Sequence, residues 1–140
     1  MKKILLLAVL FFFGFIGIAQ AQTWHTANQV TVAWDAVTTL SNGDPIPSGD
    51  SISYNIYIKL EDGTNLEHVG TTNMLTHTIT FNAEGRYFIG FQTVRVPEGE
   101  TEQQLSATVW SSDPAICANN EDFGVKFFLA AGTVTGVRLQ

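Results

Sequence analysis

FNAEGRYFIGFQTV, residues 81–94, gives the clearest indication of how this chain folds. Phe81 stands six positions before Tyr87, and the turn pair Glu84-Gly85 lies between them. This spacing is typical of a tyrosine corner, in which the phenol ties a strand crossover to nearby backbone. The residues after Tyr87 alternate in polarity, as in a half-buried strand. We therefore interpret the stretch as the corner and second-last strand of a small β-sandwich.

Other short runs rich in Val, Ile, Thr, Tyr and Phe flank this stretch, separated by turn residues such as Asn42-Gly43 and Asp62-Gly63. No segment has the periodicity of an amphipathic helix, so we predict an all-β fold. Six strands at this spacing predict an antiparallel sandwich with Greek-key connections. The predicted strands cover residues 30–34, 52–59, 66–71, 77–81, 87–94 and 105–110.

The pattern resembles an immunoglobulin-like fibronectin type III module over residues 29–112. The resemblance is carried by Trp34 on the first long strand, Tyr54 on the next, and the spacing from Phe81 to Tyr87. It implies a β-sandwich of about seven strands in which these four residues are structural. Modules of this family mostly act as spacers or as protein-binding and adhesion units, and some accompany secreted carbohydrate-active enzymes or phage structural proteins.

The N-terminus has the order of a secretory signal peptide. Lys2 and Lys3 precede an apolar run, residues 4–18, and the small-residue pattern Ala19-Gln20-Ala21 follows. Because this run is shorter than the roughly 20 residues that span a bilayer, we predict cleavage after Ala21 rather than a membrane anchor. We expect the protein to be secreted, periplasmic or at the cell surface. We divide the chain into a signal peptide (1–21), a sandwich (22–113) and a C-terminal tail (114–140), which we expect to form a strand pair packing on the sandwich.

The charge balance is acidic. Without Lys2 and Lys3 the chain has five Lys and Arg residues against 13 Asp and Glu, a formal charge of −8. This disfavours nucleic acid as a partner, and we expect no membrane insertion after signal cleavage. Cys117 is the single cysteine, so an intrachain disulfide is impossible, and either a buried thiol or a disulfide between chains remains open.

Both ends of the sandwich depart from the fibronectin-like pattern. Only 12 residues after the predicted cleavage site, 22–33, precede Trp34, so we expect the opening strand to be short or missing. Residues 132–140 resemble such an opening strand placed at the wrong end. We expect this segment to pair within its own chain. Donation to a neighbouring copy by strand addition is the alternative, and it would give self-association.

Three aromatic residues form one candidate binding surface. If Tyr54 and Tyr87 face the core, side-chain alternation turns Tyr57 and Phe88 outward on neighbouring strands, and Trp110 is placed to join them. Exposed aromatic rings on a sheet are suited to a sugar or a protein partner. We expect instead that residues 123–129 fold back and cover these rings.

The loop of residues 97–104 is a second candidate, because fibronectin-like modules often carry recognition residues there. It contributes Glu98, Glu100 and Glu102, which solubility alone would also explain. We predict no metal and no cofactor: the histidines lack the paired spacing of a zinc site, and the loop aspartates match no calcium pattern.

No catalytic motif is present in the sequence, and we do not expect an enzyme. The leading hypothesis is an exported, non-catalytic binding or structural module that acts through protein–protein interaction or assembly at or beyond the cell surface. The alternative is a carbohydrate-binding module that uses the exposed aromatic residues. A small secreted enzyme is the third hypothesis. The sequence does not identify the partner, which we expect to be a protein or a glycan at the cell surface.

Overall fold

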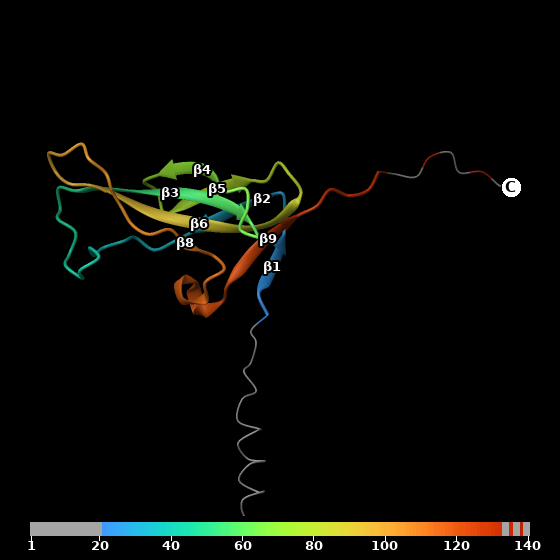
Figure 1. Ribbon diagram of the computed structural model, residues 1–140, viewed down its shortest axis with the longest axis horizontal. Coiled ribbons are helices and arrows are strands. Elements are labelled where there is room, and N and C mark those ends of the chain that lie inside the picture. The colour runs from blue at the N-terminus through green and yellow to red at the C-terminus, as the bar shows by residue number, and fades with distance from the viewer. Residues whose placement is uncertain (1–20, 133–134, 136–137, 139–140) are drawn as a thin grey trace, which may run out of the picture.

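The computed structural model describes residues 21–132, 135 and 138 (Figure 1). The predicted signal peptide and most of the predicted strand over residues 132–140 lie outside the described residues. The described chain is all-β, as expected, with two short 3-10 turns, η1 (Pro114–Ile116) and η2 (Ala118–Asn120). Its strands are β1 (Thr23–Thr26), β2 (Gln29–Ala33), β3 (Ser51–Leu60), β4 (Glu67–Thr72), β5 (Thr76–Thr80), β6 (Gly85–Val96), β7 (Gln104–Leu105), β8 (Val109–Trp110) and β9 (Phe123–Phe127).

These strands form two sheets. The larger sheet has the order β1-β9-β6-β3-β4, and the smaller sheet pairs β2 with β5. β3 lies along one edge of β6, while β9, β8 and β7 follow one another along its other edge. The described strand pairs are antiparallel except β1 with β9, which is parallel. β6 is therefore the central strand of the larger sheet.

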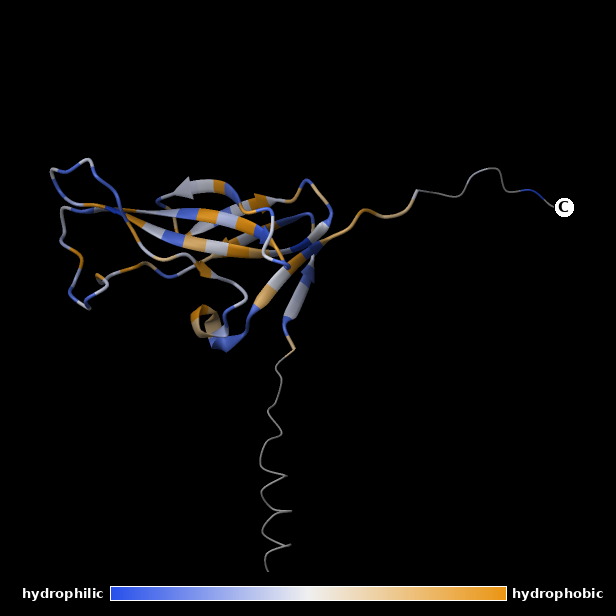
Figure 2. Ribbon diagram, viewed as in Figure 1, coloured by the Kyte–Doolittle hydropathy of each residue, from blue (hydrophilic) through white to orange (hydrophobic). Residues whose placement is uncertain are grey.

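Apolar residues from both sheets make one buried cluster, so the sheets face each other across it. In β3 the residues at even positions belong to this cluster or pack against it, whereas those at odd positions do not. Apolar and polar residues alternate along the strand accordingly (Figure 2). This alternation confirms the faces that the sequence predicts, because strand side chains repeat every two residues. The buried members are Val32, Tyr54, Ile56, Ile58, Ile79, Phe81, Tyr87, Ile89 and Val125.

The predicted corner hydrogen bond is present. Tyr87 Oη donates to the backbone oxygen of Ala83 at 2.7 Å, and the ring of Tyr87 lies 4.9 Å from that of Phe81, centroid to centroid. Both residues are buried, so the phenol fixes the chain reversal between β5 and β6 while its ring fills the core. The Phe81–Tyr87 spacing in the sequence predicts this contact correctly.

Trp34 follows β2 and packs at the other end of the core. Its ring lies 5.4 Å from Tyr54 and 5.2 Å from Phe91, and Tyr54 Oη accepts a hydrogen bond from the Val37 backbone N–H at 3.1 Å. These contacts tie the start of the long loop after β2 to β3 and β6. Trp34 and Tyr54 thus have the structural role expected of them.

The last part of the sheet differs from the prediction of one strand over residues 105–110. Two short strands, β7 and β8, stand there instead. Ser106 causes the break, because its hydroxyl accepts from the Thr93 backbone N–H at 2.9 Å and donates to the oxygen of Ala107 at 2.8 Å. The side chain thus replaces a backbone partner in the ladder.

After Ser111 the chain leaves the sheet through η1 and η2 and returns at Phe123, whose N–H donates to the Ser111 oxygen at 2.8 Å. β9 then continues along the same edge of β6. The tail thus contributes one strand to the larger sheet, and Val125 is part of the core. The expectation that residues 123–129 cover the outer aromatic rings is wrong, because residues 123–127 form a strand of the sheet next to β6 rather than a layer over its outer face.

β1 is the short opening strand. It has four residues and pairs with β9 in the larger sheet, not with β2 (Figure 1). The sequence indicates that this strand is short, but it does not indicate the partner. Among the described residues, β2 therefore has β5 as its only strand neighbour.

Candidate functional site

The candidate site is the face of the larger sheet that points away from the core. Tyr57, Phe88 and Trp110 all lie on this face, as expected. Tyr57 and Trp110 stand on either side of Gly90, which pairs with both of them across neighbouring strands. Tyr57 and Trp110 are both half-buried.

Phe88 does not have the exposure that a binding residue needs. It is only 8% exposed, because the ring of Trp24 covers it at a centroid distance of 5.5 Å. Trp24 comes from β1, which sequence reasoning did not place in this sheet. The prediction of Phe88 as a binding residue is therefore corrected: Phe88 packs beneath Trp24, and Trp24 takes its place on the surface.

Both tryptophans lie flat against the sheet because glycines leave room for them. A Cβ atom on Gly90 would lie 2.7 Å from the Trp110 ring, and one on Gly124 would lie 2.4 Å from the Trp24 ring. No side chain fits at such distances without a shift of the ring. Gly90 and Gly124 thus set the height of the two indoles above the strands.

A cation accompanies each indole. Lys59 Nζ lies 4.0 Å from the centroid of the Trp110 ring, and the Arg86 guanidinium carbon lies 5.3 Å from that of Trp24. Both distances are within the range of cation–π attraction. Lys126 pairs in register with Arg86 and so shares its face of the sheet. We call this surface the aromatic–cationic face; its residues are Trp24, Tyr57, Lys59, Arg86, Trp110 and Lys126.

Polar contacts hold Tyr57 in place. Its hydroxyl donates to Gln92 Oε1 at 3.2 Å, and its ring lies 5.2 Å from the imidazole of His68 on β4. Gln92 also accepts from Asn55 Nδ2 at 3.3 Å. Because the ring is fixed by neighbours on β4 and β6, little conformational entropy would be lost if a ligand stacked on it.

The second candidate, the acidic loop, lies elsewhere. The loop of residues 97–104 lies at the end of the molecule away from β1 and β9 (Figure 1), and its Glu98, Glu100 and Glu102 are exposed. The Glu98 backbone N–H donates to Asp50 Oδ1 at 3.0 Å, which ties this loop to the start of β3. The structure therefore does not bring the three glutamates together with the aromatic rings.

Asp50, at the start of β3, connects the acidic loop to β6 through an ion pair. Its carboxylate pairs with the Arg95 guanidinium and is almost completely buried. Burial acts to raise the pKa of Asp50, but the hydrogen bonds from Arg95 and from the Glu98 N–H outweigh it and lower the pKa below its ordinary value. Asp50 is thus a structural carboxylate that stays charged.

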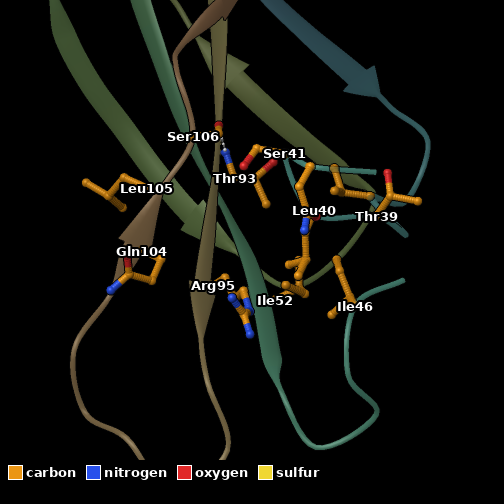
Figure 3. Close-up of a pocket in the computed structure, with 12 residues that line it drawn as sticks. Thr39, Leu40, Ser41, Ile46, Ile52, Thr93, Arg95, Gln104, Leu105 and Ser106 are labelled. Atoms are coloured by element: carbon orange, nitrogen blue, oxygen red, sulfur yellow. Dashed lines mark hydrogen bonds between the residues drawn. The ribbon is translucent and has the colours of Figure 1, made fainter. Parts of the chain in front are cut away.

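A groove of about 660 Å³ lies beside this ion pair (Figure 3). Its wall combines the loop after β2 with the ends of β3, β6 and β7. Arg95 lines it, but its guanidinium is already paired with Asp50. None of the sequence-predicted binding residues lines the groove, whose apolar part consists of Val37, Leu40, Ile46, Ile52 and Leu105.

The residues that could support catalysis or metal binding are scattered. In residues 21–132, 135 and 138 no three His, Cys, Asp or Glu side chains come together as a metal site. Cys117 is half-buried, and burial, assisted by Asp122 and Asp113, raises the pKa of its thiol. A raised pKa disfavours the thiolate and so makes this cysteine a poor nucleophile at neutral pH.

No helix in the described part of the chain is long and apolar enough to span a bilayer. No protein-family model matches the sequence, and comparison with curated proteins and with solved structures found no match.

Proposed function

We propose that the chain is an immunoglobulin-like, fibronectin type III-like sandwich. The strand order supports this, since β2 and β5 make a small sheet and β4, β3 and β6 continue into a last, interrupted strand of the other sheet. The corner between Phe81 and Tyr87 supports it as well. The pairing of β1 with β9 is the main departure.

We further propose that it is an exported, non-catalytic module that acts through protein–protein contact or assembly at or beyond the cell surface. The observation that carries this proposal is the second edge of β2. In an antiparallel pair, every second residue of β2 forms its backbone hydrogen bonds with β5. The backbone N–H and C=O groups of the others, Gln29, Thr31 and Ala33, point to the opposite side, where the described chain places no strand. Such an edge can accept a strand from a partner, and backbone hydrogen bonds then provide the affinity.

Deletion of residues 132–140 tests assembly. The proposal takes up the alternative to pairing within the chain, in which residues 132–140 are donated to the β2 edge of a neighbouring copy. On that alternative we expect concentration-dependent multimers of the purified protein in sedimentation velocity, and we expect the deletion to abolish them. Thr31→Pro, which removes a backbone donor from the edge, should have the same effect without shortening the chain. A protein that stays monomeric at all concentrations, or multimers that survive both changes, would contradict assembly of this chain through the edge of β2.

Export is tested separately by N-terminal sequencing of the protein recovered outside the cytoplasm. We expect a chain that begins at Gln22. An intact Met1 in that fraction would contradict cleavage after Ala21.

Carbohydrate binding is the second candidate function, and the aromatic–cationic face favours it. Aromatic rings held flat on a sheet offer a surface on which sugar rings stack. Glycan-array binding that is lost in Tyr57→Ala with Trp110→Ala would support this candidate. Met74→Ala, a change of an exposed residue in the turn between β4 and β5, is the control.

A further inference from the structure

Positive charge gathers on the aromatic–cationic face. The chain has seven Lys and Arg residues, two of which are Lys2 and Lys3. Three of the other five, Lys59, Arg86 and Lys126, lie on this single face of the larger sheet. In a chain with 13 acidic residues, such a concentration of cations favours an anionic ligand at this surface.

These cations are available to a ligand. Within the described residues, Lys59 and Lys126 have no carboxylate partner within ion-pair distance. Arg86 lies 3.4 Å from Glu61, with both side chains about half exposed. An exposed pair of this kind is weak and exchanges readily with an external anion. By contrast, Arg95 is held by the buried Asp50 on the opposite face of the sheet.

The shape of the face narrows the chemistry of the ligand. Trp24, Tyr57 and Trp110 are half-buried, with their rings close to the plane of the sheet, and Gly90 and Gly124 keep the two indoles low. The groove that Arg95 and Leu105 line lies at the other end of the molecule, away from these rings. A flat aromatic surface with nearby cations matches sugar rings that carry acidic groups.

We propose that the aromatic–cationic face binds an anionic polysaccharide. A sugar ring stacks on Tyr57, while Lys59, which lies over the Trp110 ring, and Arg86, which lies over the Trp24 ring, donate to its carboxylate or sulfate groups. From β3 to β1 the face crosses three strand spacings, about 14 Å, which accommodates a short oligosaccharide. This inference rests on the carbohydrate-binding candidate and is independent of assembly through β2.

Binding of the purified protein to two matched pairs of polymers tests the proposal. Polygalacturonate is compared with its methyl ester, which carries no charge, and dextran sulfate is compared with neutral dextran. We expect binding to at least one charged polymer and at least about tenfold weaker binding to its neutral counterpart. Binding to polygalacturonate would indicate recognition of carboxylate groups, and binding to dextran sulfate would indicate recognition of sulfate groups. Affinity should fall as salt rises, because the contact is ionic.

Two sets of variants locate the site. Lys59→Gln with Arg86→Gln should weaken binding about tenfold or more, and Tyr57→Ala should weaken it while leaving the salt dependence unchanged. Arg138→Gln removes a charge outside the face and should have no effect. Thermal unfolding of each variant checks that it is folded. If the double variant is unstable, Lys59→Gln alone replaces it, because this change breaks no ion pair.

The other outcomes are informative. Equal binding to charged and neutral polymers, lost in Tyr57→Ala, would overturn the anionic preference and retain carbohydrate binding. Equal or tighter binding to poly-glutamate would overturn a glycan ligand in favour of an acidic protein. Absence of binding to all four polysaccharides would overturn both the inference and the carbohydrate candidate, while leaving the assembly proposal untouched.

Discussion

Replacement of Tyr87 by phenylalanine isolates the contribution of the corner hydrogen bond. The change removes the hydroxyl that donates to the Ala83 oxygen at 2.7 Å, but it keeps the ring that packs 4.9 Å from Phe81. Core volume is therefore almost unchanged, and any loss of stability reports on the hydrogen bond rather than on a cavity.

The expected loss follows from the environment of the bond. A neutral hydrogen bond contributes a net of about 1 kcal/mol to stability, and the Tyr87 side chain that donates this one is buried. We expect the free energy of unfolding to fall by about 1–1.5 kcal/mol. With an unfolding entropy of about 2.1 cal/mol/K per residue, this corresponds to a decrease in Tm of about 4–6 °C.

Urea unfolding followed by tryptophan fluorescence measures this loss, and Tyr57→Phe is the matched control. The Tyr57 hydroxyl bonds Gln92 at 3.2 Å on the outer face, where water can replace the partner. Its loss should therefore cost less than about 0.5 kcal/mol. If the two variants lost the same stability, the corner would be no more than another surface hydrogen bond, and our reasoning would be refuted.

A pH series gives a second measurement on the same variant. Burial raises the pKa of Tyr87 above its ordinary value, and the nearby Glu67 carboxylate acts in the same direction. The folded state therefore retains the proton to a higher pH than the unfolded state does. The resulting stability is complete below about pH 10 and is lost as the pH rises through the folded pKa. Tyr87→Phe should make this alkaline decline shallower, and an unchanged slope would contradict the assignment.

Three further experiments test other parts of the structure. Gly90→Ala should destabilise the protein by about 1–3 kcal/mol in urea unfolding, because the new methyl meets the Trp110 ring, whereas Gly132→Ala, with open space around it, should be neutral. Asp50→Asn should lower stability at neutral pH. Since the folded pKa of Asp50 is lowered, the difference from the original protein should shrink as the pH falls below about 3.9, and a pH-independent difference would contradict the ion pair. Cys117 should react with iodoacetamide at pH 8 more slowly in the folded than in the urea-unfolded chain, and equal rates would contradict its raised pKa.

Much of the framework is predictable from local patterns. The spacing from Phe81 to Tyr87 predicts the corner bond, and period-two alternation predicts which residues of β3 face the core. Both are relations between residues close in sequence, so backbone geometry alone fixes them. The same alternation correctly turns Tyr57 and Trp110 outward.

The composition of the candidate site is less predictable, because it depends on which strands become neighbours. Phe88 is buried only because β1 pairs with β9 and brings Trp24 over it. The parallel pairing joins residues about 100 positions apart, and no local pattern specifies such a partner. A single tryptophan among the polar residues of a four-residue strand was the available signal, and it does not distinguish a cover from an exposed ring.

Hydrophobic periodicity and turn chemistry in the amino-acid sequence thus establish an all-β chain, its inward and outward faces and its tyrosine corner, because these depend on neighbours within a few positions. The order of strands at the edge of the larger sheet is a tertiary property. It depends on the backbone hydrogen bonds that β9 makes with β6 and β1, and backbone groups are the same for every residue type except proline. That pairing buries Phe88, exposes part of Trp24 and brings Arg86 and Lys126 together, and so it creates the surface on which we expect a ligand to bind.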